Sequence, residues 1–228
     1  MVLLLSACKA IHLATIKVDP TIEQSTTAVP VQLKMHFSNR SFKFAEFEGE
    51  AFKGRKNETY EKFSVINEGS AEASDTFKLA SQSGEKWRGV CHFSSQWKGV
   101  QSIQFSWGSS SKCEYFEDGG TNSIGVLEFT EYPEDLPGST VLAKYSNKSG
   151  LSIEFHSIHQ SADGPMFTTP IGFDIWMNNK NVGAISCAGT SEPKIWMPKS
   201  ITPAQRLAIA LSLWPLITYE SADNRLAH

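Results

Sequence analysis

The sequence predicts a mainly β fold, an antiparallel barrel or sandwich of about a dozen short strands with one apolar C-terminal helix packed inside or against it. Three observations support this prediction. Apolar and polar residues alternate along most of the chain from Val31 onward, as they do in half-buried strands. Turns rich in Gly, Ser and Asn separate these runs at regular spacing, which is typical of sandwiches and barrels. One segment near the C-terminus is apolar on nearly every side, and such a helix must be buried.

The expected strands follow one another along the chain. In the first, four apolar residues share one face: Val31, Leu33, Met35 and Phe37. In the second, over 42–47, the alternation slips at Ala45, which predicts a β-bulge. The further strands are expected over 63–65, 87–93, 100–107, 113–116, 124–130, 140–145, 151–158, 171–177, 182–187 and 194–197. Residues 117–120 form a strong turn signal, and 146–150 and 178–181 are expected to be hairpin connections.

The helix begins with a clear start signal. Thr202 is suited to the N-cap, Pro203 to the first helical position, and Gln205 completes a capping box. The run over 207–214 is apolar, and Pro215 is expected to kink or end the helix. Because this run is far shorter than the roughly 20 residues that span a bilayer, burial within the β structure is the better interpretation.

The length and composition predict one domain. With 228 residues and an apolar fraction of 40%, the chain can bury a substantial core. We expect a single β-rich domain over 31–219, including the helix at 203–214, preceded by a tether or irregular lead-in over 9–30. Residues 1–8 are expected to be the remnant of a signal, and 220–228 a polar tail.

The charge excludes one large class of partner. The formal net charge is −3, and the sequence contains no basic patch of the kind that nucleic acids require. It also contains no phosphate-binding glycine loop, zinc finger or nucleotide motif, so no cofactor is predicted. The charged fraction of 20% is below the average for soluble domains, and Ser, Thr, Gly and aromatic residues take its place, as in many extracytoplasmic β domains.

The strand series followed by the apolar helix resembles a known fold. The segments that carry the resemblance are Phe173-Asp174-Ile175-Trp176, the turn at 178–181, Val182-Gly183-Ala184-Ile185, Ile195-Trp196 and the helix at 203–214. They resemble the tubby-like C-terminal fold shared with scramblase and LURP-one-type proteins, in which a hydrophobic C-terminal helix threads a β-barrel. The chain has no cluster of basic residues that would carry over phosphoinositide binding, so the resemblance implies at most a barrel that binds an apolar or lipid ligand.

The N-terminus carries a second resemblance. Leu5-Ser6-Ala7-Cys8 resembles a lipobox, where bacterial lipoprotein precursors are cut and lipidated. The apolar stretch before Cys8 is shorter than a signal requires and has no Lys or Arg, so the simplest interpretation is that the true start lies upstream. The alternative is an ordinary apolar N-terminus that contains a cysteine by chance. The resemblance implies that Cys8 is acylated and that Lys9 permits sorting to the outer membrane.

The chain has four cysteines. If Cys8 carries lipid, the other three allow one disulfide and one remaining thiol. Cys91 and Cys113 flank a stretch that reads as strand, strand and turn, so this pairing is the preferred one. Cys187 is expected to be a buried core thiol, although pairings of Cys91 or Cys113 with Cys187 stay open.

One strand carries residues that could bind a metal. Glu154 and His156 share a face of the expected strand and could bind one metal or act as an acid/base pair. His159 lies three residues further on, a spacing that places residues of a strand on opposite faces. Because metal sites usually have three or four ligands, a solvated strand face is the preferred interpretation.

The last candidate is an aromatic residue. Trp97 has polar neighbours in a Ser- and Gly-rich setting, so an exposed indole there could contact a sugar or a protein partner. The alternative is that Trp87 and Trp107 belong to the core and only Trp97 is exposed.

Together these features predict a lipid-anchored protein of the bacterial cell envelope, at the periplasmic face of the outer membrane. We expect a non-catalytic binding or structural module, attached to the membrane by its lipid, with an envelope protein or a glycan as partner. Two alternatives are a metal-dependent envelope hydrolase that uses Glu154, His156 and His159, and a tubby-like barrel that binds an apolar or lipid ligand.

Overall fold

The computed structural model describes residues 15–35, 40–63, 66–100, 103–132, 140–162, 164, 166–167, 169–187 and 193–219. The predicted signal remnant with Cys8 and the predicted polar tail lie outside the described residues. The helices are α1 (Pro20–Ser25) and α2 (Pro203–Ile217). The strands are β1 (Thr26–Pro30), β2 (Gln32–Met35), β3 (Arg40–Phe44), β4 (Phe47–Phe63), β5 (Ile66–Ser81), β6 (Lys86–Val100), β7 (Ile103–Glu117), β8 (Ser123–Tyr132), β9 (Thr140–Ser146), β10 (Ser152–Ile158), β11 (Gly172–Met177), β12 (Lys180–Ser186) and β13 (Lys194–Pro198).

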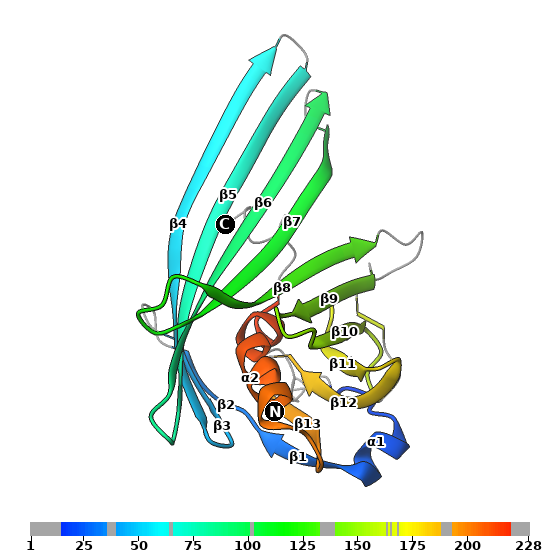
Figure 1. The fold of residues 1–228 in the computed structure, drawn as a ribbon. Coiled ribbons are helices and arrows are strands. Elements are labelled where there is room, and N and C mark those ends of the chain that lie inside the picture. Colours follow the sequence, from blue (N-terminus) through cyan, green and yellow to red (C-terminus); the bar gives the residue numbers. More distant parts are fainter. Residues whose placement is uncertain are drawn as a thin grey trace, which may run out of the picture.

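The strands form one antiparallel sheet that is nearly closed into a barrel (Figure 1). Neighbours in the sheet are also neighbours in sequence from β2 to β13, and β1 pairs with β13 at the far edge. The two edge strands, β1 and β2, are separated in the chain only by Val31, so chain continuity brings the edges together. The backbone N–H of Val31 donates to the carbonyl of Pro193, 2.8 Å away, just before β13. The prediction of an antiparallel β fold is therefore confirmed, with the barrel as its form.

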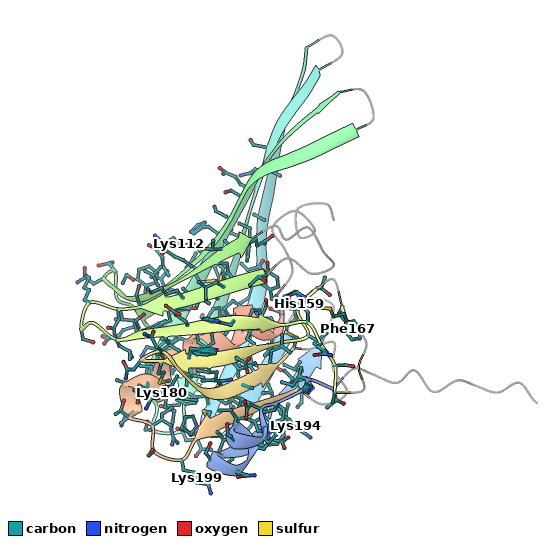
Figure 2. The ribbon with its side chains drawn as sticks, turned by 90° about the vertical axis from the view of Figure 1, so that its right-hand side faces the viewer. Lys112, His159, Phe167, Lys180, Lys194 and Lys199 are labelled. Carbon is teal, nitrogen blue, oxygen red and sulfur yellow. A yellow bond between two sulfur atoms is a disulfide. The ribbon has the colours of Figure 1, made fainter. Side chains whose placement is uncertain are left out.

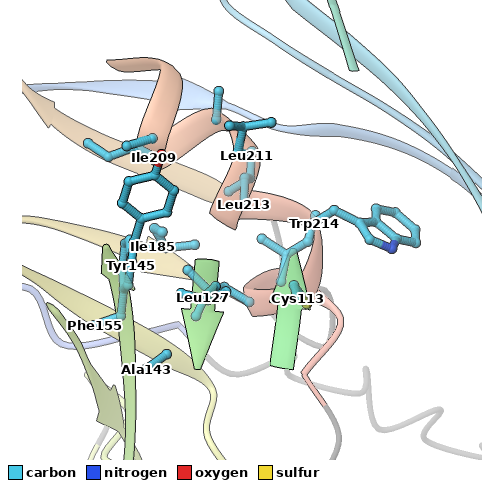
Figure 3. Packing of buried hydrophobic residues seen from close by; sticks show 14 of the residues in the cluster. Cys113, Leu127, Ala143, Tyr145, Phe155, Ile185, Ile209, Leu211, Leu213 and Trp214 are labelled. Atoms are coloured by element: carbon cyan, nitrogen blue, oxygen red, sulfur yellow. The ribbon is translucent and has the colours of Figure 1, made fainter. Parts of the chain in front are cut away.

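The inside of the barrel is occupied by α2 (Figure 1), as Figure 3 shows from close by. The predicted capping box is present, because the Gln205 N–H donates to Thr202 Oγ1 (3.2 Å) and the Thr202 N–H donates to Gln205 Oε1 (2.9 Å). Every residue over 208–217 is buried against the inner face of the sheet. Pro215 was expected to kink or end the helix. It does not end it, because the helix continues to Ile217. Among the described residues, no helix is long and apolar enough to cross a membrane.

Aromatic rings packed on glycines hold the sheet against α2. The Phe42 ring stacks on Trp214 of α2, with ring centroids 5.2 Å apart, and its other neighbour is Gly49 on β4. A Cβ at Gly49 would lie 2.2 Å from Phe42 Cζ, so only glycine leaves room for the ring. Phe77 occupies the same position over Gly89, where a Cβ would also lie 2.2 Å from the ring. These glycines are therefore required by close approach.

The connection between β3 and β4 differs from the prediction. Phe44 and Phe47 are paired, so Ala45 and Glu46 form a two-residue turn with Ala45 at a φ of 46°. The predicted bulge at Ala45 is wrong, because a two-residue turn interrupts the alternation just as an extra residue in one strand would. The predicted hairpin after β11 is confirmed, since Asn178 and Asn179 both have positive φ, the geometry of a tight hairpin turn.

The N-terminal segment is part of the domain. Ile16, Val18 and Ile22 are buried in a second apolar cluster on the outer face of the barrel, together with Ile158 and Ile171. Within the described part of the expected tether, 15–30, the structure contains α1 and β1 instead, so that prediction is wrong there. The physical reason is that three apolar side chains among many polar ones suffice to cover the apolar patch formed by Ile158, Ile171 and Ala184 on the outer face.

Four strands are much longer than predicted. The strands β4, β5, β6 and β7 contain 17, 16, 15 and 15 residues, and their outer parts leave the barrel as a four-stranded arm (Figure 1). We define the arm as residues 52–63, 66–76, 92–100 and 103–110. The pairing of β3 with β4 ends at Ala51, and the pairing of β7 with β8 ends at Ser111, so the arm begins where these neighbours stop.

Candidate functional site

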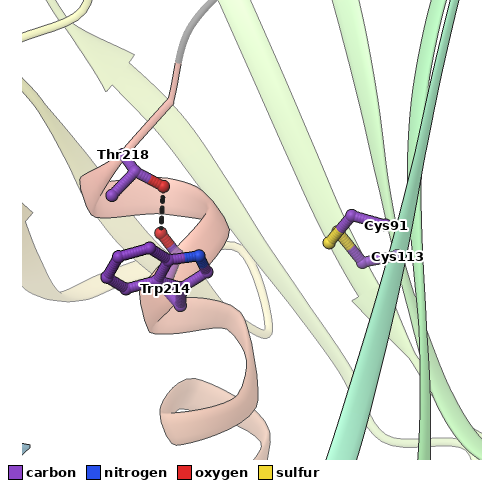
Figure 4. Close-up of a disulfide and its surroundings, with 4 residues drawn as sticks. All are labelled: Cys91, Cys113, Trp214 and Thr218. Carbon is purple, nitrogen blue, oxygen red and sulfur yellow. Dashed lines mark hydrogen bonds between the residues drawn. A yellow bond between two sulfur atoms is a disulfide. The ribbon is translucent and has the colours of Figure 1, made fainter. Parts of the chain in front are cut away.

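The two expected disulfide partners are joined. Cys91 on β6 lies directly opposite Cys113 on β7, with Cα atoms 3.9 Å apart, and a disulfide connects them on the side that faces α2 (Figure 4). Both residues are buried in the core cluster. Cys187 is outside this bond and buried, and burial raises the pKa of its thiol to about 12. Since the thiolate is the reactive form, Cys187 is an inert core residue, as predicted.

The predicted pair of Glu154 and His156 lies in a larger group on the outer face of the barrel. We call this group the outer-face cluster, which consists of Lys144, Glu154, His156, Asp174 and Trp176. Its residues come from β9, β10 and β11, where Glu154 is opposite both Lys144 and Trp176, and His156 is opposite Asp174. Their neighbours in sequence point inward to the core, so strand alternation places the whole cluster on the opposite face.

Glu154 connects two basic side chains. One of its carboxylate oxygens lies 3.3 Å from His156 Nε2, and the other lies 3.6 Å from Lys144 Nζ. The His156 ring stacks on the Trp176 indole, with centroids 5.0 Å apart and an interplanar angle of 19°. The side chains of Glu154 and His156 are 38% and 41% exposed. The imidazole is therefore held at the surface by a carboxylate at its edge and an indole on one face.

Asp174 and Trp176 are partly buried members of the cluster. Burial raises the pKa of the Asp174 carboxyl above its usual value, while Asn181 and His156 act in the opposite direction. Asp19 of the N-terminal segment adds a further small rise in the pKa of Asp174, so this segment lies near the cluster. The indole Nε1 of Trp176 is buried and has no hydrogen-bond partner among the described residues. The cluster thus contains one carboxylate and one indole that solvent reaches only in part.

His159 does not join this cluster. It follows the last residue of β10, and its Nδ1 lies 3.1 Å from the carbonyl oxygen of Phe167, its neighbour in Figure 2. Its Nε2 lies 3.0 Å from Ser157 Oγ, so both ring nitrogens are engaged away from Glu154. The structure therefore does not assemble the three ligands expected from Glu154, His156 and His159. Nowhere in the described residues do three His, Cys, Asp or Glu side chains gather closely enough to hold a metal ion.

Trp97 lies in the arm. It is in β6, where its backbone pairs with Gly69 of β5 and Ser106 of β7. Its side chain is not among those that the structure describes, so the expectation that it contacts a ligand stays a prediction.

A groove on the outer side of β2–β6 is a second candidate surface. It encloses about 480 Å³ and is lined by four lysines, Lys34, Lys43, Lys78 and Lys86, and three acidic residues, Glu48, Glu50 and Asp118. Lys43 and Glu48 form an ion pair across the β3–β4 hairpin. Because these exposed charges of both signs largely balance, the groove shows no preference for an anionic or a cationic ligand.

Asp174, Trp176 and Lys144 are the members of the cluster that sequence reasoning missed. The sequence could have placed two of them on the outer face, because Asp174 and Trp176 alternate with buried residues along β11. Their relation to Glu154 and His156 depends on the register between strands, which the sequence of one strand does not contain.

No family model matches the chain, and neither a curated protein nor a solved structure shows significant similarity to it.

Proposed function

We propose that this chain is a lipid-anchored protein of the bacterial cell envelope that binds a glycan through the outer-face cluster without catalysing a reaction. The observation that carries the proposal is the arrangement of Glu154 between Lys144 and His156, with the His156 ring stacked on Trp176. Two carboxylates and an amine supply hydrogen-bond acceptors and donors for sugar hydroxyl groups. The stacked rings supply a flat apolar surface for the C–H face of a sugar.

Export is supported by the disulfide. Disulfides persist in oxidising compartments, among them the bacterial periplasm, and are rare in the cytosol. The Cys91–Cys113 bond lies in the buried core, where it serves stability. An exported protein with a lipobox-like N-terminus fits attachment by lipid at Cys8 and a position at the periplasmic face of the outer membrane.

A barrel that binds an apolar ligand is a weaker proposal. In that function the ligand would occupy the inside of the barrel, as the resemblance to tubby-like proteins implies. Here α2 lies inside, and its residues over 208–217 are buried against the inner face of the strands. An apolar ligand would have to displace this helix, whereas the outer-face cluster is accessible without any rearrangement.

Binding to the cluster is tested with purified peptidoglycan sacculi in a sedimentation assay. We expect the full-length protein to sediment with sacculi, and His156→Ala and Glu154→Gln to reduce the bound fraction at least tenfold. His92→Ala and Glu117→Gln are matched controls, because His92 and Glu117 are exposed strand residues outside the cluster. Equal binding by all four variants would contradict the role of the cluster, and no binding by the unsubstituted protein would contradict this glycan as the partner.

Lipid attachment is tested separately by growth with an alkyne-bearing fatty acid. The protein, expressed from its natural gene, should become labelled, and Cys8→Ala should lose the label. Cys187→Ala is the matched control, because Cys187 is buried and should not carry lipid. Label that persists in Cys8→Ala would refute the lipobox interpretation.

A further inference from the structure

In the part of the chain that the structure describes, the arm has two strand edges without a neighbouring strand. Among the described residues, β4 pairs with β3 only up to Ala51, so 52–63 are hydrogen-bonded on one side alone, to β5. In the same way, β7 pairs with β8 only from Ser111 onward, which leaves 103–110 bonded to β6 alone. Each row of unpaired N–H and C=O groups is a template for another strand.

The two edges match each other in position. The residues at the outer end of the arm form one row across the four strands, in which Phe63 pairs with Ile66, Ile66 with Val100, and Val100 with Ile103. Register shifts occur at 54–55 in β4 and at 107 in β7. Both edges are therefore regular near the outer end of the arm, over 56–63 and over 103–106.

The directions of the edges also match. The four strands alternate in direction, so β4 runs outward and β7 runs back toward the barrel (Figure 1). A second copy placed alongside in the same orientation would bring its β7 next to β4 of the first copy. These two strands would be antiparallel, as every neighbouring pair in this sheet already is.

The edge strands differ in how well their sequences protect them from pairing with another chain. The barrel edges β1 and β2 contain Pro30 and Lys34, and proline and lysine protect edge strands from unwanted pairing. The β7 edge, with sequence IQFSWGSS over 103–110, contains no charged residue and no proline. The β4 edge over 56–63 contains two lysines and two glutamates. If two β4 edges paired antiparallel with 56–63 fully overlapping, Glu58 would lie opposite Glu61, a like-charge contact that pairing of β4 with an uncharged β7 avoids.

We propose that the arm joins copies of this chain, with β7 of one copy adding to β4 of the next in a continuous antiparallel sheet. The contact is head-to-tail, so a pair of copies keeps one free β4 edge and one free β7 edge for further neighbours, and the assembly closes into a ring or grows as a filament. The interface lies on the arm, whereas the outer-face cluster lies on β9–β11. Assembly is therefore independent of the proposed glycan binding.

Mixed cysteine crosslinking tests the pairing. Lys62 on β4 and Gln104 on β7 belong to one row of paired residues across the arm. If the outer ends of two neighbouring arms are level, Lys62 of one copy would therefore lie opposite Gln104 of the next. Full-length Lys62→Cys and full-length Gln104→Cys are mixed and treated with a short bismaleimide. We expect a crosslinked dimer in the mixture and none in either variant alone. A dimer from Lys62→Cys alone would overturn the head-to-tail contact.

Light scattering of the unsubstituted full-length protein in detergent provides the second measurement. We expect a mass above that of one chain, and Ser106→Lys should return it to that of a monomer, because a lysine protects the edge. Ser152→Lys, at an exposed position on β10, is the control and should leave the mass unchanged. A monomer for the unsubstituted protein at every concentration tested would overturn the proposal.

Discussion

The barrel body and the arm are built from the same strands, β4–β7, yet their inner faces are packed differently. In the body, the inner face of these strands carries Phe77, Leu79 and Tyr115, which belong to one buried cluster with α2. Further along the same face, the next row contains Ala73, Phe93 and Ser111, of which Phe93 still belongs to the buried cluster. Between the two parts lies the row that contains the Cys91–Cys113 disulfide.

This difference separates two requirements of a β-sheet. The hydrogen-bonded ladder continues from the body into the arm without regard to the size of the side chains. Among the described side chains, Phe93 is the outermost member of the core cluster on β4–β7, and large side chains of this kind fill the space between the sheet and a helix. The body is therefore stabilised by packing on α2, whereas the arm is held together by backbone hydrogen bonds between its strands.

The largest expected effect comes from a charge in the body. Leu211→Asp places an unpaired carboxylate at a fully buried position of α2, at a cost of several kcal/mol, which should prevent folding. Thr76→Asp is the matched change in the arm, where Thr76 is exposed, and should cost less than about 1 kcal/mol. Circular dichroism and thermal unfolding would measure both. A stable Leu211→Asp variant would show that α2 is not needed for the barrel.

The next effect concerns the boundary between body and arm. Replacing both Cys91 and Cys113 with alanine removes a crosslink between residues 22 apart in sequence, which should lower the free energy of unfolding by about 3 kcal/mol. Urea unfolding measures this loss. A reductant should destabilise the unsubstituted protein by a similar amount and leave the double variant unchanged. If the reductant affects both proteins equally, the disulfide is not the cause.

A smaller effect is expected from overpacking between two strands of the body. Gly89→Ala would place a Cβ 2.2 Å from Phe77 Cε1 and should cost about 1–3 kcal/mol. Phe77→Leu removes the ring edge that the new methyl group meets. The double variant should therefore be more stable than the sum of the two single changes predicts, as a double-mutant cycle would reveal. Strict additivity would mean that the ring and the glycine do not constrain each other.

The elements that the sequence predicted are those with a local signal. Thr202, Pro203 and Gln205 mark the start of α2 within four residues, and the apolar run that follows fixes its burial. The preferred pairing of Cys91 with Cys113 needed only the expectation that they flank a hairpin. Each of these predictions depends on residues that are close in the chain.

The arm and the cluster depend on relations that no single strand encodes. Alternation predicts a strand only where large apolar residues recur on one face. It therefore indicated part of the arm, over 100–107, but not the stretches around Ser70, Ser94 and Ser110. In the cluster, Trp176 lies opposite Glu154 only because β11 pairs with β10 in one register. A shift by one residue would have turned Trp176 toward the core.

The smallest effect is expected from Asp174, on the part of the outer face of the body that lies near the N-terminal segment. Burial raises the pKa of Asp174 above 3.8, so the folded protein keeps this proton to a higher pH than the unfolded chain does. The contribution of Asp174 to stability therefore falls as the pH rises from about 3.8 through the raised value, and stays low at neutral pH. Asp174→Asn should remove this loss, giving a slightly higher melting temperature at pH 7 and little change below pH 3.5. A lower melting temperature at pH 7 would mean that the interactions of the carboxylate with Asn181 and His156 outweigh its burial.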